Sequence, residues 1–448
     1  MDFKLSRAKI EEFFSVIITI VAGFFTVAFF KLNNSFAFFN LDEMLWHSRS
    51  KIFWDKMLNY DFSGLIQSAQ PGITVYWFAG FLVRFIDNFD PYRIKAAIAE
   101  KEAIGLDFNF INENNQALYA ANRTISFVFN VPLILDLFIF FILFYYLLRK
   151  VGFNKIISYF SLFFLSTNIY LAYWTTPSDK MLNIFMTLSF LCFLVFILEK
   201  GGRKYFYLSA VLGALAVLSK LSALFLFPFY LMISLIEAGK MNKEKIICIF
   251  KDYSLWLSVF VVVCVIFLPT IIFFPGEVYN LVFHPSNTIY ETGYAPLSYL
   301  ERLWEFFNLF VTLIITSNLA TASSIFFLVF LFMYPKRRFS NFLEGVPDKT
   351  VRVMSAYFLL FCLMVTIISN NHDIRFMAPA FVIMSVFSAI GLYMLAKFVT
   401  NKLNISEKMF YLAAVAIITM ANMFSLITSG SVFEDAINKY FNLGMIHL

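Results

Sequence analysis

Residues 40–79 read NLDEMLWHSRSKIFWDKMLNYDFSGLIQSAQPGITVYWFA, a polar and aromatic stretch in a chain that is otherwise mostly apolar. The stretch opens with two adjacent carboxylates, Asp42 and Glu43, and contains a Gln70-Pro71-Gly72 break near its end. It follows the first long apolar run, so in a membrane protein it would lie at the membrane surface. We therefore expect the remaining helices to be arranged around it.

The composition of the chain excludes an ordinary soluble protein. Hydrophobic residues make up 60% of the 448 residues and charged residues 14%, whereas soluble proteins carry about 25% charged residues. Apolar runs long enough to span a bilayer recur from end to end, and they are continuous rather than alternating. The sequence predicts an all-α polytopic membrane protein, a single domain over residues 1–448 with no soluble domain. The eleven expected spans are 13–30, 124–148, 156–174, 181–198, 206–219, 221–236, 254–274, 306–334, 353–369, 378–396 and 409–428.

The distribution of basic residues predicts the orientation of these spans. Of the 35 Lys and Arg residues, 21 fall in segments that this arrangement places in the cytoplasm and six in its short external segments. This bias follows the positive-inside rule, from which long loops are exempt. Residues 31–122 then form a long external loop, with the N-terminus inside and the C-terminus outside. Treating 71–87 as a further span would reverse the bias, so we expect interfacial helices there.

Cysteine and histidine spacing gives no sign of a metal centre or a disulfide framework. The four cysteines lie in or beside apolar runs, and no two histidines have metal-ligand spacing. We therefore assign no cofactor and no metal ligands, although a divalent metal stays open. Because topology accounts for the positive charge, the chain has no implied nucleic-acid partner.

Asp42 and Glu43 have two interpretations. Asn40 followed three residues later by Glu43 resembles a capping box, and acids favour a helix N-terminus. Alternatively, a helix that starts here carries Asp42, Trp46 and Arg49 on one face, at the outer end of the first span, where a carboxylate can do chemistry. Glu43 falls on the neighbouring face, so the two acids cannot both point at one atom.

A second set of charged residues lies at the predicted outer ends of other spans. Asp179 follows Pro177 at the start of a span, so it serves equally well as a helix-start acid or as a site residue. Arg123, Lys220 and Arg375 are basic residues on the external side, which the positive-inside bias disfavours. Snorkelling explains such residues in general, but an anionic ligand at the outer interface would explain all three together.

These motifs resemble a known family. The pattern DExxWxxRSxxF, which begins at Asp42, followed by QPGITVYWFAG, is similar to the first external loop of the C-type glycosyltransferases that use polyprenyl-phosphate sugars. The similarity is greatest to the protein O-mannosyltransferase-like and aminoarabinose-transferase-like branch. Further similar segments are Ala121-Asn122-Arg123, Asp179, LGALAVLSKLSALFLFP at 212–228 and Asp373-Ile374-Arg375-Phe376. The chain departs from the pattern where Gln70 replaces a frequent His or Lys and Phe376 replaces a Tyr.

The resemblance implies a hexosyl- or pentosyltransferase, multi-pass in a bacterial inner membrane, with its site facing outward. It would move a sugar with inversion from a polyprenyl-phosphate donor to a lipid, glycan or protein acceptor. We assign Asp42 as general base, Asp179 and Glu43 as further catalytic residues, and Arg123, Lys220, Arg375 and Arg49 as ligands of the donor phosphate. Two alternatives remain: a lipid or polysaccharide transporter or flippase, and an inactive scaffold descended from such enzymes.

Overall fold

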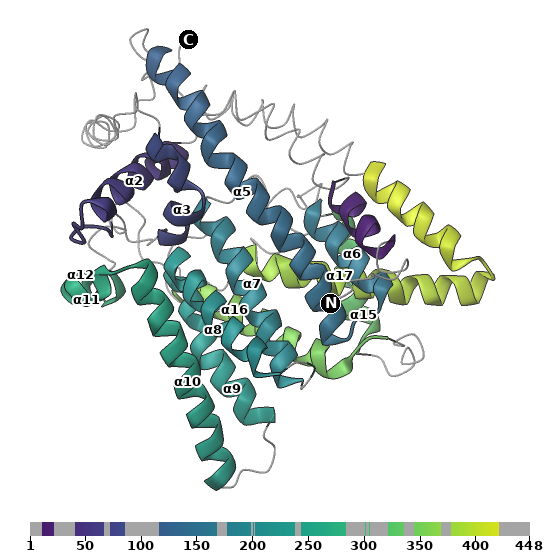
Figure 1. Cartoon of the computed structure of the whole chain (residues 1–448). Helices are drawn as coiled ribbons and strands as arrows, with labels where there is room; N and C mark the ends of the chain where they lie inside the picture. The colour runs from purple at the N-terminus through teal and green to yellow at the C-terminus, as the bar shows by residue number, and fades with distance from the viewer. Residues whose placement is uncertain are drawn as a thin grey trace, which may run out of the picture.

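The computed structural model describes residues 11–21, 41–66, 72–85, 116–167, 177–198, 202–237, 243–283, 321–335, 345–368 and 378–420, together with residues 200, 301 and 304. All regular elements in these ranges are helices (Figure 1). They are α2 (Leu41–Leu58), α3 (Ile73–Phe78), η1 (Gly80–Phe85), α5 (Gln116–Val151), α6 (Lys155–Ser166), α7 (Pro177–Ile197), α8 (Arg203–Ser219), η4 (Leu221–Phe225), α9 (Leu226–Glu237), α10 (Lys243–Phe267), α11 (Thr270–Phe273), α12 (Pro275–Phe283), α15 (Thr321–Met333), α16 (Asp348–Ile368) and α17 (Ala378–Leu403). Residues 11–21 and 407–420 are also helical.

Helix α7 lies in the middle of the bundle. All its residues from Pro177 to Val195 are buried, and it packs against α8, α5 and α17. A helix that is apolar all round and enclosed on every side is a core helix, not one that faces lipid. Its N-terminal end therefore places Asp179 inside the protein, not on its surface.

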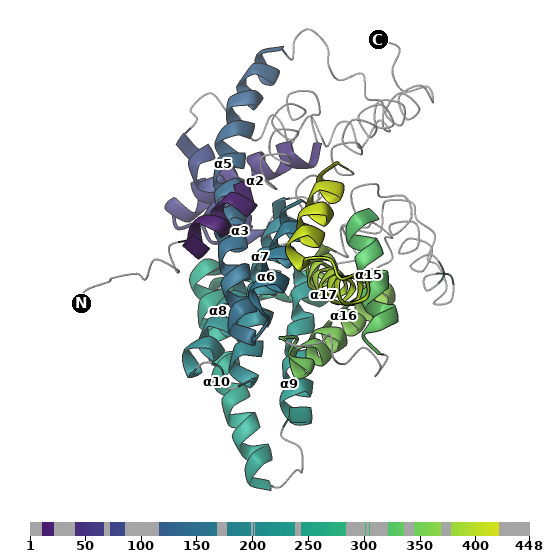
Figure 2. The same cartoon turned by 90° about the vertical axis from the view of Figure 1, so that its right-hand side faces the viewer.

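The helices around α7, among them α5 and α8, form a first group. Helices α15, α16 and α17 form a second group beside it (Figure 2). Gly391 lets α17 approach α15 closely, because a Cβ atom at this position would overlap the backbone carbonyl of Phe326. Small residues serve this purpose at helix contacts in membranes, where backbones can then pack against each other. Helix α17 also packs against α6 and α7, and so joins the two groups.

Four helices in the described part of the chain are long and apolar enough to cross a membrane. They are residues Val131–Val151 of α5, and α7, α10 and α17. Other described helices coincide with the remaining predicted spans in whole or in part, and the total of eleven stays a prediction. Helix α10 begins at Lys243 and not at residue 254, because a helix can continue through charged residues beyond its apolar stretch. Its end at Phe267 precedes Pro269, which lacks the N–H that would continue the helix.

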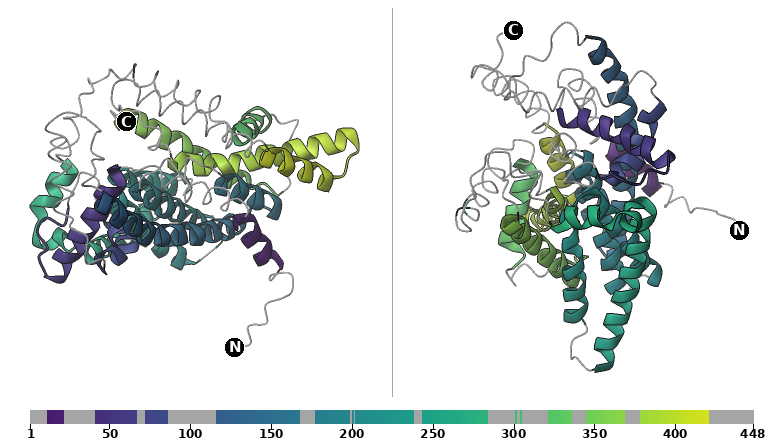
Figure 3. Two further views of the ribbon diagram at one scale, coloured as in Figure 1. Left: turned by 90° about the horizontal axis from the view of Figure 1, so that it is seen from above. Right: turned by 90° about the vertical axis from the view of Figure 1, so that its left-hand side faces the viewer.

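The distribution of charge predicted that residues 71–87 lie at the membrane interface. The described residues of this segment do not form one long helix. Residues 72–85 divide into α3 and η1, each six residues long and too short to span a bilayer. Helices α2 and α3 lie across one end of the bundle, above α10 and α12, as Figures 1 and 3 show. The placement of the whole segment 31–122 outside the cell stays a prediction, and most of residues 86–122 lie outside the described part.

Candidate active site

Helix α2 packs closely on α3 and η1, and two glycines permit the approach. Gly72 has φ 59°, and a Cβ atom there would overlap the ring of Trp46. A Cβ atom on Gly80 would overlap the side chain of Ser50 in the same way. The indole of Trp54 donates a hydrogen bond to the carbonyl of Tyr76 at 2.8 Å. The two motifs thus form one unit, which we call the cap. It comprises residues 41–66 and 72–85, with helices α2, α3 and η1.

The cap is bonded to the C-terminal end of α8. The amide of Gly72 donates to the carbonyl of Ser219 at 3.2 Å. The hydroxyl of Ser219 donates to Leu215 within its own helix, so the hydroxyl of Thr74 is the donor in the 2.6 Å contact between Thr74 and Ser219. Both hydroxyls are buried. These bonds fix Gly72, the last residue of the Gln70-Pro71-Gly72 motif, next to Lys220, the residue that follows α8.

Lys220 and Asp179 form a buried ion pair beneath this contact. Nζ of Lys220 lies 2.6 Å from Oδ1 of Asp179, and the two side chains are 8% and 2% exposed. Helix α8 ends at Ser219 because Lys220 takes an extended conformation, which turns its side chain away from the helix path. Each charge offsets part of the desolvation penalty that the other would bear alone in this interior.

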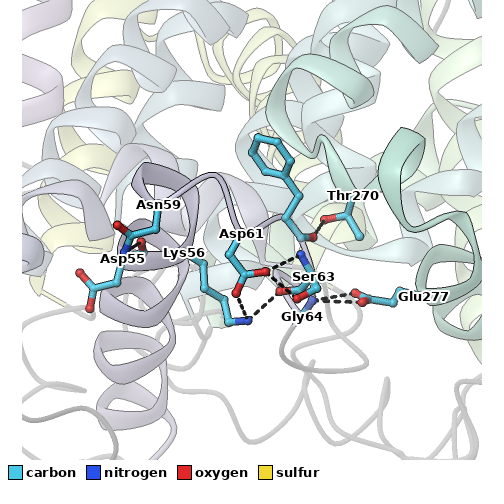
Figure 4. A network of polar contacts seen from close by, with 9 residues as sticks. Asp55, Lys56, Asn59, Asp61, Ser63, Gly64, Thr270 and Glu277 are labelled. Atoms are coloured by element: carbon cyan, nitrogen blue, oxygen red, sulfur yellow. Dashed lines mark hydrogen bonds and ion pairs between the residues drawn. The ribbon is translucent and has the colours of Figure 1, made fainter.

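A second set of bonds attaches the cap to α10, α11 and α12. The indole of Trp77 donates to the carbonyl of Phe267 at 3.0 Å. The amide of Gly64 donates to both carboxylate oxygens of Glu277, at 3.1 and 3.0 Å, and the hydroxyl of Thr270 donates to the carbonyl of Phe62 at 2.9 Å (Figure 4). The cap is therefore bonded to three consecutive helices that lie 190 to 213 positions away from it in the sequence.

The turn after α2 is stabilised by a charged carboxylate. Asp61 accepts hydrogen bonds from the hydroxyl of Ser63 at 2.6 Å and from Nζ of Lys56 at 2.9 Å (Figure 4). These bonds, with the one from Ser63 as the largest cause, lower the pKa of Asp61. Gly64 completes the turn with φ 61°, a conformation that favours glycine.

One face of α2 carries Asp42, Trp46, Arg49 and Phe53 at helical spacing. The guanidinium carbon of Arg49 lies 5.4 Å from the ring centre of Trp46, within the range of a cation–π contact. Asp42 and Glu43 stand in the first turn of α2. This helix begins at Leu41, the position that an N-cap residue at Asn40 would require. Their side chains lie outside the described part, as does Asn40.

The predicted site residues thus divide into three sets. Asp179 and Lys220 are brought into direct contact, and Arg49 lies in the cap that is bonded to Ser219 beside Lys220. Arg123 lies on α5, with its side chain outside the described part, and Arg375 lies wholly outside it. Among the described residues no group of three His, Cys, Asp or Glu side chains could hold a metal ion.

Sequence reasoning did not single out Ser219, Thr74, Glu277 or Tyr76. Thr74 and Tyr76 belong to the quoted QPGITVYWFAG motif, so the motif itself was the available signal. Glu277 had none, because it lies more than two hundred positions from Gly64 in the chain.

Part of the chain matches a known protein family. Residues 93–290 match the family model of the dolichyl-phosphate-mannose-protein mannosyltransferases. The matched range contains Arg123, Asp179 and Lys220, whereas α2 and α3 precede it. Neither the curated proteins nor the solved structures include a match to this chain.

Proposed function

From the premise that residues 93–290 form a domain of the dolichyl-phosphate-mannose-protein mannosyltransferases, a family of C-type glycosyltransferases, we propose that the protein moves a sugar from a polyprenyl-phosphate donor to an acceptor on the outer face of the membrane. The family's own donor is an isoprenoid-phosphate mannose, so mannose is the first sugar to test. A protein hydroxyl is the acceptor that the family name suggests. Lipid and glycan acceptors remain alternatives.

One observation carries this proposal: the buried pair of Lys220 and Asp179 lies where the cap is bonded to the bundle. The donor's lipid tail must stay in the bilayer while its sugar meets a water-side acceptor. A site under an interfacial cap, at the ends of apolar helices, meets both requirements. A transporter instead places its polar residues near mid-membrane, commonly on broken helices.

Basic residues would hold the donor phosphate. Arg123 is our main ligand of the phosphate, and Lys220, Arg375 and Arg49 are secondary cations. Asp179 holds the Lys220 ammonium in one position, which supports a role in orienting the site. Fixed cations also stabilise the charge that develops on a departing phosphate, so no acid is needed on that side.

The reaction we propose is a single displacement with inversion. The oxygen of the acceptor hydroxyl attacks the anomeric carbon from the face opposite the phosphate. The bond from the anomeric carbon to the phosphate oxygen breaks, and its electron pair leaves with the polyprenyl phosphate. The hydroxyl proton passes to the carboxylate of Asp42, the general base, a contribution of about 10²–10⁴-fold. Glu43, one position away on the helix, would belong to the capping box at the helix start and is the second candidate for the base.

Transfer by the purified protein tests this proposal. The protein is reconstituted in liposomes with radiolabelled mannosyl polyprenyl phosphate and a mixture of serine- and threonine-containing peptides and lipid acceptors. We expect label in the acceptor fraction and free polyprenyl phosphate as the second product. Movement of intact donor across the bilayer without transfer would instead identify a flippase. If the donor is neither transferred nor moved across the bilayer, the result would indicate an inactive scaffold.

A further inference from the structure

Tyr76 occupies the centre of the cap. Its side chain is fully buried, and its ring centre lies 5.8 Å from that of Trp46 and 5.1 Å from that of Phe53. Trp46 and Phe53 stand on either side of Arg49 along one face of α2. The tyrosine ring therefore lies across the face of α2 that carries Arg49.

The hydroxyl of Tyr76 is buried and makes no hydrogen bond to any described residue. Buried hydroxyls usually have a partner, because leaving one unsatisfied costs free energy. Phenylalanine would fill the same space among Trp46 and Phe53 without this cost. Packing alone therefore does not explain why this position carries a hydroxyl group.

The surroundings of this hydroxyl suit an anion. Burial raises the pKa of Tyr76, while the nearby positive charge of Arg49 acts in the opposite direction. The hydroxyl therefore keeps its proton and can donate it in a hydrogen bond. Arg49 is only partly buried, so its guanidinium offers an anion a charged contact at the edge of this face of α2. A protonated hydroxyl beside an arginine is a suitable pair of donors for a phosphate oxygen.

We propose that the Tyr76 hydroxyl donates a hydrogen bond to the phosphate of the isoprenoid donor, which Arg49 draws to the same face of α2. This inference rests on the proposed function, since it names a further binding residue of that site. Because the Tyr76 side chain is fully buried, this bond requires the Arg49 side chain to move and open the way to the hydroxyl. Because a hydrogen bond to a charged group is a strong one, its loss should weaken binding roughly tenfold or more.

Tyr76→Phe tests the proposal with two readouts of opposite sign. Without a ligand, removing an unsatisfied hydroxyl should leave the thermal unfolding temperature in detergent unchanged or raise it. Binding of farnesyl phosphate should weaken at the same time. Tyr357→Phe is the matched control, because Tyr357 on α16 is also fully buried with an unpartnered hydroxyl. It should match Tyr76→Phe in stability and keep full affinity.

Three probes identify what the hydroxyl recognises. Farnesyl phosphate carries the lipid and the phosphate, farnesol the lipid alone, and inorganic phosphate the anion alone. We expect Tyr76→Phe to weaken farnesyl phosphate binding and to leave the weak binding of farnesol unchanged. A parallel loss for inorganic phosphate would support a site for the anion itself.

Two results would overturn the proposal. One is unchanged farnesyl phosphate affinity in a stable Tyr76→Phe protein. The other is a fall in stability of Tyr76→Phe without ligand, which would show that the hydroxyl has a structural partner. Binding is measured without sugar transfer, so a wild-type protein that binds farnesyl phosphate but transfers no sugar would refute only the proposed function.

Discussion

Nζ of Lys220 lies 2.6 Å from Oδ1 of Asp179, although the two residues are 41 positions apart in the chain. The contact joins the C-terminal end of α8 to the N-terminal end of α7, the most enclosed helix of the bundle. Two opposite charges in an apolar interior are costly when separated. The pair thus both holds α7 against α8 and contains two residues of the proposed site.

Replacing one partner of this pair should destabilise the protein strongly. Lys220→Met removes the ammonium that lies 2.6 Å from the buried Asp179 carboxylate, and we expect a loss of about 3–5 kcal/mol in the free energy of unfolding. Asp179→Asn combined with Lys220→Met should recover much of that loss. Denaturant unfolding in detergent, followed by tryptophan fluorescence, compares the two variants with the wild type.

The matched control is Lys397→Met. Lys397 pairs with Glu407 at 2.7 Å, but both side chains are partly exposed, at 27% and 39%. Such a pair contributes about 0–1 kcal/mol. If Lys220→Met and Lys397→Met lose equally little free energy of unfolding, the buried pair contributes no more to stability than the exposed pair.

The sequence predicted the location of this pair but not the contact. The basic bias placed the ends of the spans at Asp179 and Lys220 on one side of the membrane, which is the arrangement their contact requires. Hydropathy identifies which stretches are apolar, but it carries no information on which helices are neighbours. For the same reason, the sequence could show Gly72 as a break but could not show that it packs on Trp46.

Helix ends were harder to predict than helices. The start of α10 at Lys243 lies well before the apolar stretch, because hydrogen bonding along the backbone does not stop where hydrocarbon ends. The division of residues 72–85 into α3 and η1 agrees with the expected interfacial segment. That expectation rested on charge balance alone.

Gly72→Ala should destabilise the cap. The new Cβ atom would overlap the Trp46 ring, and φ 59° is unfavourable for alanine, so we expect a loss of about 1–3 kcal/mol. Gly276→Ala is the control, since nothing lies within 4 Å of a Cβ atom at that position. Thermal unfolding in detergent compares the two. The packing of Trp46 on Gly72 is refuted if Gly72→Ala melts with the wild type.

The turn at Asp61 should contribute stability that depends on pH. Its folded-state pKa is lowered, first by the hydrogen bond from Ser63, so the contribution is present above the unfolded pKa of about 4 and is lost as pH falls through the folded value. The denaturation midpoints of the wild type and Asp61→Asn should therefore differ at pH 6 and converge below about pH 4. In a Ser63→Ala background the folded pKa moves back toward the unfolded value, so the convergence should be complete at a higher pH. A constant difference across the whole range would contradict the account.

The sidedness of the cap can be measured with cysteine chemistry. Tyr60, at the end of α2, is 82% exposed, so Tyr60→Cys should react with a membrane-impermeant thiol reagent in intact cells. The native Cys248 on α10 is also exposed, but it lies toward the predicted cytoplasmic side. It should react only after the membrane is opened. Labelling of Cys248 but not of Tyr60→Cys in intact cells would reverse the proposed orientation.

The identity of the general base is tested by two neighbouring acids. Asp42 lies on the face of α2 that carries Trp46 and Arg49, whereas Glu43 lies on the adjacent face. An acceptor hydroxyl must lose its proton during attack, so Asp42→Asn should lower kcat by about 10²–10⁴-fold while donor binding is retained. Glu43→Gln should cause a milder loss, because its removal affects the helix start.

Single-turnover transfer of radiolabelled sugar, together with farnesyl phosphate binding, separates these effects. A general base affects the chemical step and not the affinity for the donor, so Asp42→Asn should reduce the rate at saturating donor. Asp179→Asn should instead lower stability, because it removes the carboxylate charge that lies 2.6 Å from the buried Lys220 ammonium. Near-full activity in Asp42→Asn, with complete loss in Glu43→Gln, would move the role of base to Glu43.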